Sequence, residues 1–227
     1  MNFYEGNAEK IFERLLAAHD STKAIIRNQC FEAEYKFFRK YIRCQRILVC
    51  GSGLGHDSFE LAGFNRQVVG IELLPELVQY SAQQPKMKSS KNVLFFQGDL
   101  LRLHLNLQVS LAGCFDAALM NMGTICNFSQ TEQMVIIQNV LKLAKVFYFN
   151  FYPPTKESLK TRLKMYAEEY WGKLWLDGTT IFSEDGLYSK SYTKKHFRDL
   201  AKELGFQIKF HNLLHFVIMA EVTAPNK

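Results

Sequence analysis

Short apolar runs alternate with amphipathic segments along most of the chain. Runs of Val, Ile, Leu and Phe without polar alternation are typical of strands that are buried on both faces of a parallel sheet. These runs predict strands over residues 46–50, 67–72, 92–97, 115–121, 145–151, 206–211 and 214–222. The segments between them predict helices over residues 55–63, 75–84, 130–142 and 193–204. Alternation of this kind predicts a doubly wound α/β fold.

The two ends of this regular region have a different pattern. Apolar positions at helical spacing predict two helices before the first strand, over 7–19 and 22–43. The segment 152–192 opens with Tyr152-Pro153-Pro154, and its pattern predicts a helix over 155–170 and a hairpin that pairs 179–183 with 187–192. We therefore expect an N-terminal helical cap over 1–45 and a main domain over 46–227, with an insertion at 152–192.

A cluster of glycines follows the first strand. Gly51, Gly53 and Gly55 lack a Cβ, so a ligand can approach the backbone there, and the next helix presents unpaired N–H groups at its start. The second strand ends on Glu72, at a spacing of about 20 residues from the first glycine, which suits an acidic residue that accepts ribose hydroxyls. The pattern indicates a nucleoside site.

The spacing of the glycines distinguishes between nucleosides. A dinucleotide site has a third glycine where this chain has the bulky His56, which argues against NAD or FAD. The G-x-G-x-G pattern resembles motif I of the class I S-adenosylmethionine (SAM)-dependent methyltransferases. Residues 48–57 are also similar to motif I of the thiopurine S-methyltransferase-like branch, which acts on small thiols and related molecules. His56 itself is a candidate contact to the cofactor.

The resemblance covers residues 46–151. It implies that Glu72 binds the ribose, that Asp99 after the third strand lies near the adenine, and that Asn121-Met122-Gly123 passes under the transferring methyl group. It also implies a seven-stranded, mostly parallel, Rossmann-like sheet with an antiparallel last strand. SAM is the implied cofactor, S-adenosylhomocysteine (SAH) its product, and no metal is needed. The implied cofactor-binding residues are Cys50, Gly51, Ser52, Gly53, Gly55, Asp57, Glu72, Leu73, Asp99, Leu100, Asn121 and Met122.

One position departs from the family pattern. Many members carry an acidic residue two places before the first glycine, where it orders the glycine loop, and this chain has Val49. The acceptor site is less defined by motifs: Tyr4, Gly123 and Tyr152 are its candidate residues. No general base follows from the pattern, and Tyr152 is a weak catalytic candidate because it follows the fifth strand.

Charge and cysteine usage bear on the possible partners, on disulfides and on metal sites. The formal charge is +6, which allows an acidic partner such as nucleic acid. The basic residues form only small groups, which we expect to be solvated faces: Lys86, Lys88 and Lys91; Lys156, Lys160, Arg162 and Lys164; Lys194 and Lys195. The five cysteines include no C-x-x-C pair, which argues against a disulfide framework or a zinc site. No secretory signal or run of about 18 apolar residues is present, so we expect a cytoplasmic protein without a membrane span.

The leading hypothesis is a SAM-dependent methyltransferase that acts on the nitrogen, oxygen or sulfur of a small molecule. Aromatic residues of the N-terminal helices and of the insertion would enclose that molecule. The first alternative is methylation of RNA or protein, which the charge motivates and which predicts one continuous basic face. The second is a methyltransferase-like binding protein without activity, which Val49 and the missing general base motivate.

Overall fold

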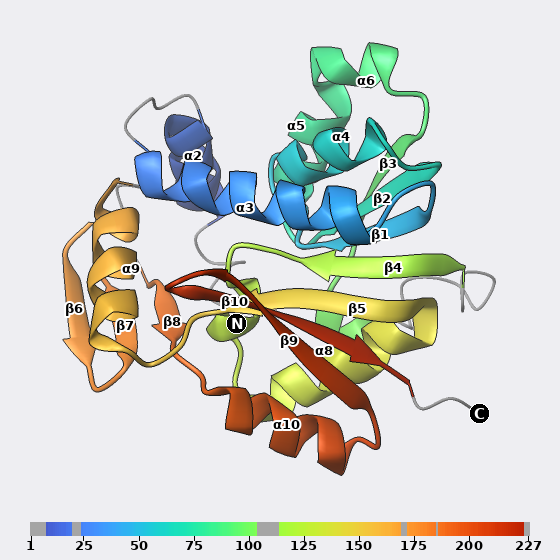
Figure 1. Cartoon of the computed structure of the whole chain (residues 1–227). Coiled ribbons are helices and arrows are strands. Elements are labelled where there is room, and N and C mark those ends of the chain that lie inside the picture. Colours follow the sequence, from blue (N-terminus) through green and yellow to red (C-terminus); the bar gives the residue numbers. More distant parts are fainter. Residues whose placement is uncertain (1–7, 20–23, 104–113, 169–171, 185, 225–227) are drawn as a thin grey trace.

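A large twisted sheet runs through the middle of the molecule (Figure 1). The computed structural model describes residues 8–19, 24–103, 114–168, 172–184 and 186–224; Tyr4 lies outside them. The strand order is β3-β2-β1-β4-β5-β10-β9. β1 to β5 are parallel, and β10 is antiparallel to both of its neighbours. The strands are β1 (Arg46–Cys50), β2 (Gln67–Glu72), β3 (Val93–Gln97), β4 (Phe115–Met120), β5 (Ala144–Phe151), β9 (Gln207–Leu214) and β10 (Val217–Thr223). The predicted fold class is confirmed.

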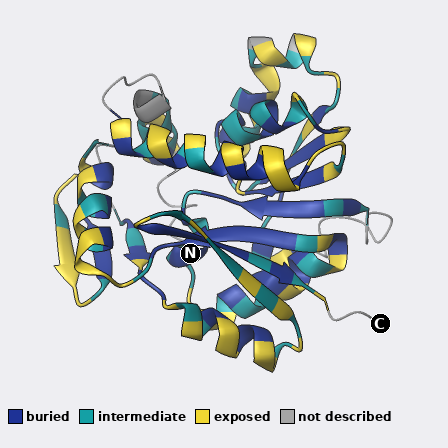
Figure 2. Ribbon diagram, viewed as in Figure 1, coloured by how far each residue is buried: buried dark blue, intermediate teal, exposed yellow. Residues whose placement is uncertain are grey.

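Helices cover both faces of this sheet (Figure 1). They are α2 (Ala8–His19), α3 (Ile25–Tyr41), α4 (His56–Ala62), α5 (Pro75–Gln83), α6 (Pro85–Ser89), α8 (Gln130–Leu143), α9 (Lys156–Glu168) and α10 (Lys194–Glu203), with short 3-10 turns η1 (Leu100–Arg102) and η3 (Thr124–Asn127). Phe38 of α3 and Leu61 of α4 pack in a core cluster on one face. Ile136 of α8 and Phe197 of α10 pack in the cluster on the other. The central strands of the sheet are buried between these layers, while the edge strands β3 and β9 and the outward helix faces carry exposed residues (Figure 2).

The predicted helix start at residue 130 is confirmed, and Ser129 is its N-cap. The Ser129 side chain accepts from the backbone N–H of Glu132, and the Glu132 side chain accepts from the backbone N–H of Ser129. This reciprocal pair satisfies donors that the first turn of a helix leaves open. It fixes where α8 begins, and therefore how far the β4–α8 connection extends at the sheet edge.

One strand start was predicted wrongly, and two elements were not predicted. The last strand begins at Val217, because β9 continues to Leu214 before the turn. The helix α6 was not predicted; it is a single short helix with Pro85 in its first turn. The insertion contains a third strand, β6 (Leu174–Asp177), which pairs with β7 (Thr180–Ser183), and β7 pairs with β8 (Tyr188–Lys190). Most of β6 is exposed at a sheet edge, so its sequence carries no burial pattern.

The insertion packs at one end of the large sheet, with α9 and the small sheet β6-β7-β8 side by side (Figure 1). One prediction fails here: Arg162 was assigned to a solvated face, but its side chain is fully buried on the inner face of α9. A helix has two sides, and a run of basic residues does not show which of them faces the core. None of the helices among the described residues has the length and apolar composition of a membrane span.

Candidate functional site

A cavity of about 250 Å³ lies where the strands β1, β2 and β4 end. In doubly wound sheets, ligands bind at the carboxyl ends of the strands. Most of the predicted cofactor residues line this cavity: Gly51, Ser52, Gly53, Asp57, Glu72, Leu73, Asp99, Leu100, Asn121 and Met122. Cys50 and Gly55 do not line it, and neither do the acceptor candidates Gly123 and Tyr152, which lie behind the wall. His56 lines it as well.

The glycine loop is tied to the second strand by its backbone. The N–H groups of Gly51 and Ser52 both donate to the carbonyl oxygen of Ile71, at 2.8 and 3.0 Å. Gly53 has φ +52°, and a Cβ built on it has no atom within 4 Å, so the backbone here borders open space. Gly55 serves a different purpose: its Cβ would lie 2.8 Å from Cζ of Phe95, so it allows close packing of loop and sheet.

Glu72 orders this loop. Its Oε2 accepts from the N–H of Gly53 at 2.9 Å, and its Oε1 accepts from the N–H groups of Leu73 and Leu74 at 2.8 and 3.2 Å. Burial raises the pKa of the Glu72 carboxyl, and the three backbone bonds oppose that shift. Val49 cannot supply a carboxylate and is buried in β1 beside Gly70 and Leu119. The second strand thus supplies a carboxylate that holds the glycine loop.

A chain of polar side chains links the N-terminal cap to the end of β4. The hydroxyl of Tyr35 in α3 donates to Oδ1 of Asp57 at 2.7 Å and also contacts Nδ1 of His56. The amide of Asn121 donates to Oδ2 of the same aspartate at 2.9 Å. Phe31 stacks on the His56 ring with centroids 4.9 Å apart. These contacts fix the orientation of Asp57 and Asn121 at the cavity wall.

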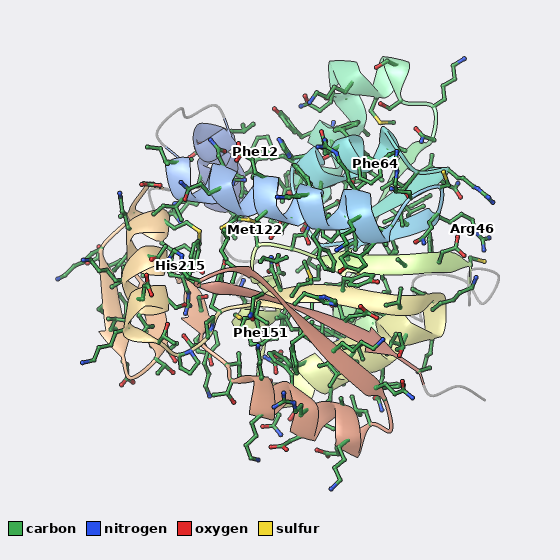
Figure 3. The ribbon with its side chains drawn as sticks, in the orientation of Figure 1. Phe12, Arg46, Phe64, Met122, Phe151 and His215 are labelled. Carbon is green, nitrogen blue, oxygen red and sulfur yellow. The ribbon has the colours of Figure 1, made fainter. Side chains whose placement is uncertain are left out.

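The loop after β4 has a constrained backbone. Met122 has φ +55°, in the left-handed region that side chains rarely adopt, and Gly123 follows with φ +66°. The N–H of Met122 donates to Oε1 of Glu34 at 3.4 Å. Asn150 bridges the two, because its Oδ1 accepts from the N–H of Gly123 and its amide donates to Glu34. Met122 lies between α3 and the insertion (Figure 3).

Tyr152 supports the same loop from behind. Its hydroxyl donates to the carbonyl oxygen of Met122 at 3.0 Å, and its ring lies against Gly123, where a Cβ would come within 2.6 Å of Cζ. Only glycine fits there. Burial raises the pKa of the Tyr152 hydroxyl well above its usual value, which favours its protonated form. The structure therefore has Tyr152 as a buried donor to the loop.

The far end of the cavity is apolar, and sequence motifs did not identify its residues. Met165 and Tyr166 of α9, Leu187 of the insertion, and Phe128 after η3 form part of its wall. Phe31 of α3 lies on the same cavity. These residues share no motif, and the only available signal was the position of the insertion after the fifth strand. In the described ranges, no three His, Cys, Asp or Glu side chains gather as metal ligands.

Comparison with solved structures supports the fold. PH0226 protein from Pyrococcus horikoshii OT3 is 22% identical, with 90% of this chain and 92% of that chain covered and a TM-score of 0.67. Magnesium protoporphyrin IX methyltransferase (ChlM) from Synechocystis PCC 6803 with bound SAH is 14% identical, with 97% of each chain covered and a TM-score of 0.67. A DhpI-SAH complex is 14% identical, with 99% of this chain and 98% of that chain covered and a TM-score of 0.69.

At these identities, structural likeness establishes the fold alone. A search of curated proteins gives no match. The family comparison is more specific, since residues 44–205 match the family described as "Methyltransferase domain". This range includes the glycine loop, Glu72, the β4 loop and the whole insertion. The chain therefore belongs to the methyltransferase domain family, and the predicted class I SAM-dependent methyltransferase family is confirmed.

Proposed function

We propose that the protein binds SAM in this cavity and transfers its methyl group to a nitrogen, oxygen or sulfur atom of a small molecule. The observation that carries the proposal is the division of the cavity. Polar loops from β1, β2 and β4 form one end, and apolar residues of the insertion form the other. The ChlM and DhpI structures contain SAH, and we assign the same ligand to the polar end here.

In this assignment, each part of the site has a task. Glu72 accepts from a ribose hydroxyl, since a carboxylate offers about four acceptor positions and three backbone N–H groups leave one of them, on Oε2. The glycine loop holds the methionine part of SAM, and Asp99 lies toward the adenine. SAM supplies its own leaving group, so the protein has only to align the acceptor with the methyl group. We assign Tyr152 a positioning role, because its hydroxyl already donates to Met122.

A small acceptor agrees better with this site than RNA does. The helices α2 and α3 and the insertion contribute to one cavity wall, through Ile11, Phe31 and Tyr166 among others. Arg162 is buried, so it does not contribute to the surface charge of the basic group at 156–164. This burial argues against a continuous basic face there. The porphyrin named for ChlM belongs to that protein and does not identify the acceptor of this one.

Calorimetry with SAM, SAH and NAD tests the cofactor assignment. We expect SAM and SAH to bind and NAD not to bind. Glu72→Ala should weaken SAH binding by about 1–3 kcal/mol, because buried ribose hydroxyls lose their acceptor. Glu60→Ala is the matched control: this carboxylate on α4 pairs with Arg39 and does not line the cavity. NAD binding, or equal SAH affinity in the Glu72 variant and the control, would contradict the assignment.

A further inference from the structure

Among the residues that the structure describes, the buried Arg162 donates its hydrogen bonds to neutral groups. Its Nη1 donates to Oγ of Ser191 at 2.6 Å, and its Nη2 donates to the carbonyl oxygen and Oγ of Ser189 at 2.6 and 2.7 Å. Its guanidinium lies 4.5 Å from the ring centroid of Tyr152 and 6.0 Å from that of Tyr166. The side chain is 0% exposed. An arginine stays charged in proteins, so this is a buried positive charge.

No carboxylate among the described residues forms an ion pair with this charge. The buried Glu34 in the same core bonds to Met122 and Asn150 instead. Cys126 is close enough to feel the guanidinium, but burial raises the pKa of its thiol to about 11, so it is neutral at pH 7. A buried charge is costly unless it is paired. Within the described residues, no carboxylate therefore balances the charge of Arg162.

The guanidinium of Arg162 lies behind one side of the cavity wall. The ring of Tyr152 lies between the guanidinium and the β4 loop, and its hydroxyl reaches Met122 in the cavity wall. One turn further along α9, Met165 and Tyr166 line the apolar end. The acidic residues in the wall are Asp57 in the first turn of α4, Glu72 at the end of β2 and Asp99 before η1. Arg27 of α3 is a cation in the same wall. The carboxylates thus lie at the strand ends, and Arg162 adds a cation behind the insertion side of the cavity.

We propose that Arg162 makes the apolar end electropositive and that the methyl acceptor reacts there as an anion, through a thiolate, phenolate or carboxylate oxygen, rather than as a neutral amine. This inference rests on the proposed function. In the step, the acceptor's lone pair forms the new bond to the methyl carbon. The sulfonium–methyl bond breaks, and its electron pair stays on sulfur to give neutral SAH. The anion loses its charge as the sulfonium does, so no proton has to leave during transfer.

The charges of the two reactants explain why this polarity selects an anion. The acidic end of the cavity stabilises the sulfonium, and the cation at the other end stabilises an anionic acceptor. Transfer to a neutral amine would instead develop a positive charge beside Arg162, where like charges repel. Arg162 acts through the field across Tyr152 and Tyr166, so it is a specificity-determining residue that need not touch the acceptor.

SAM and SAH are a matched pair for measuring this field, because they differ only by the methyl group and its positive charge. Arg162→Met should raise the affinity for SAM relative to SAH by about sixfold to sixteenfold, as expected for two unit charges about 10–15 Å apart at an effective dielectric constant of about 20. Arg162→Lys keeps the charge and should leave the ratio near its wild-type value. Lys160→Met removes an exposed charge from the same helix and should not change the ratio, because solvent screens it.

Arg162 also joins α9 to β8, so its loss can destabilise the fold. A second variant therefore changes the charge and keeps the arginine. Ser191→Asp places a carboxylate on the guanidinium without removing it, and should raise the SAM-to-SAH affinity ratio in the same direction. An unchanged SAM-to-SAH affinity ratio in folded Arg162→Met and Ser191→Asp would overturn the proposal that Arg162 acts through its electric field. Failure of the wild type to bind either ligand would instead overturn the proposed function.

The acceptor class is tested by turnover. SAH release from SAM is measured with acceptors that share one aryl skeleton and differ in the reacting group: thiol, phenol, carboxylic acid and amine. Turnover of a thiol, phenol or acid that falls in Arg162→Met and is retained in Arg162→Lys supports the proposal. Turnover confined to the amine, or unaffected by the loss of Arg162, overturns it.

Discussion

Replacement of Gly53 by alanine distinguishes an effect on cofactor affinity from an effect on the free energy of unfolding. Gly53 lines the cavity with φ +52°, and a Cβ on it would meet no protein atom within 4 Å. Gly178 in the β6–β7 turn has φ +57° and equally open surroundings, but does not line the cavity. Alanine in the left-handed conformation costs about 1–2 kcal/mol. Both variants should therefore lose a similar part of the free energy of unfolding.

Only Gly53→Ala should lose affinity for SAH, because its methyl group enters the space that the ligand uses. We expect at least a tenfold loss, which corresponds to about 1.4 kcal/mol. Urea unfolding measures the first effect and calorimetry the second. Wild-type SAH affinity in Gly53→Ala would refute the reasoning, and so would an equal loss in Gly178→Ala, since the latter residue lies outside the cavity.

Three further predictions concern the β4 loop, its buried neighbour and the helix that follows. Gly123→Ala should cost about 2–4 kcal/mol in urea unfolding, from strain at φ +66° and overlap with Tyr152; a cost below 1 kcal/mol would mean that the ring moves freely. Burial raises the pKa of Glu34 well above its usual value of 4.5, so the folded state keeps a proton that the unfolded state loses. The free energy of unfolding of the wild type should thus fall as pH rises above about 4.5. Glu34→Gln should remove this fall between pH 5 and 8. Parallel pH profiles of the wild type and the variant would contradict the raised pKa of Glu34. Ser129→Ala should cost about 1 kcal/mol by thermal or urea unfolding, because Glu132 loses its capping partner; no change would show that the cap is not a source of stability.

Local patterns in the chain predicted the parts of the site that depend on local chemistry. The apolar runs specified β1 and β2 to the residue, and the glycine spacing with Glu72 at the end of the second strand predicted which groups border the cavity. Each of these signals lies within a few residues of the group it describes. The polar end of the cavity was for this reason predictable, although Cys50 and Gly55 lie behind its wall.

The other end of the site depends on contacts between distant segments. Tyr35 meets Asp57, and Glu34 meets Asn150, only after α3 packs on the sheet. Arg162 reads in sequence as one of several surface cations, and its burial appears only when α9 closes on β8. The sequence by itself determined the sheet, the glycine loop and the carboxylate of Glu72 beside it, because these follow from hydrophobic periodicity and backbone geometry. The insertion side of the cavity and the buried charge behind it were decided by tertiary packing, because which face of a helix is buried depends on what packs against it.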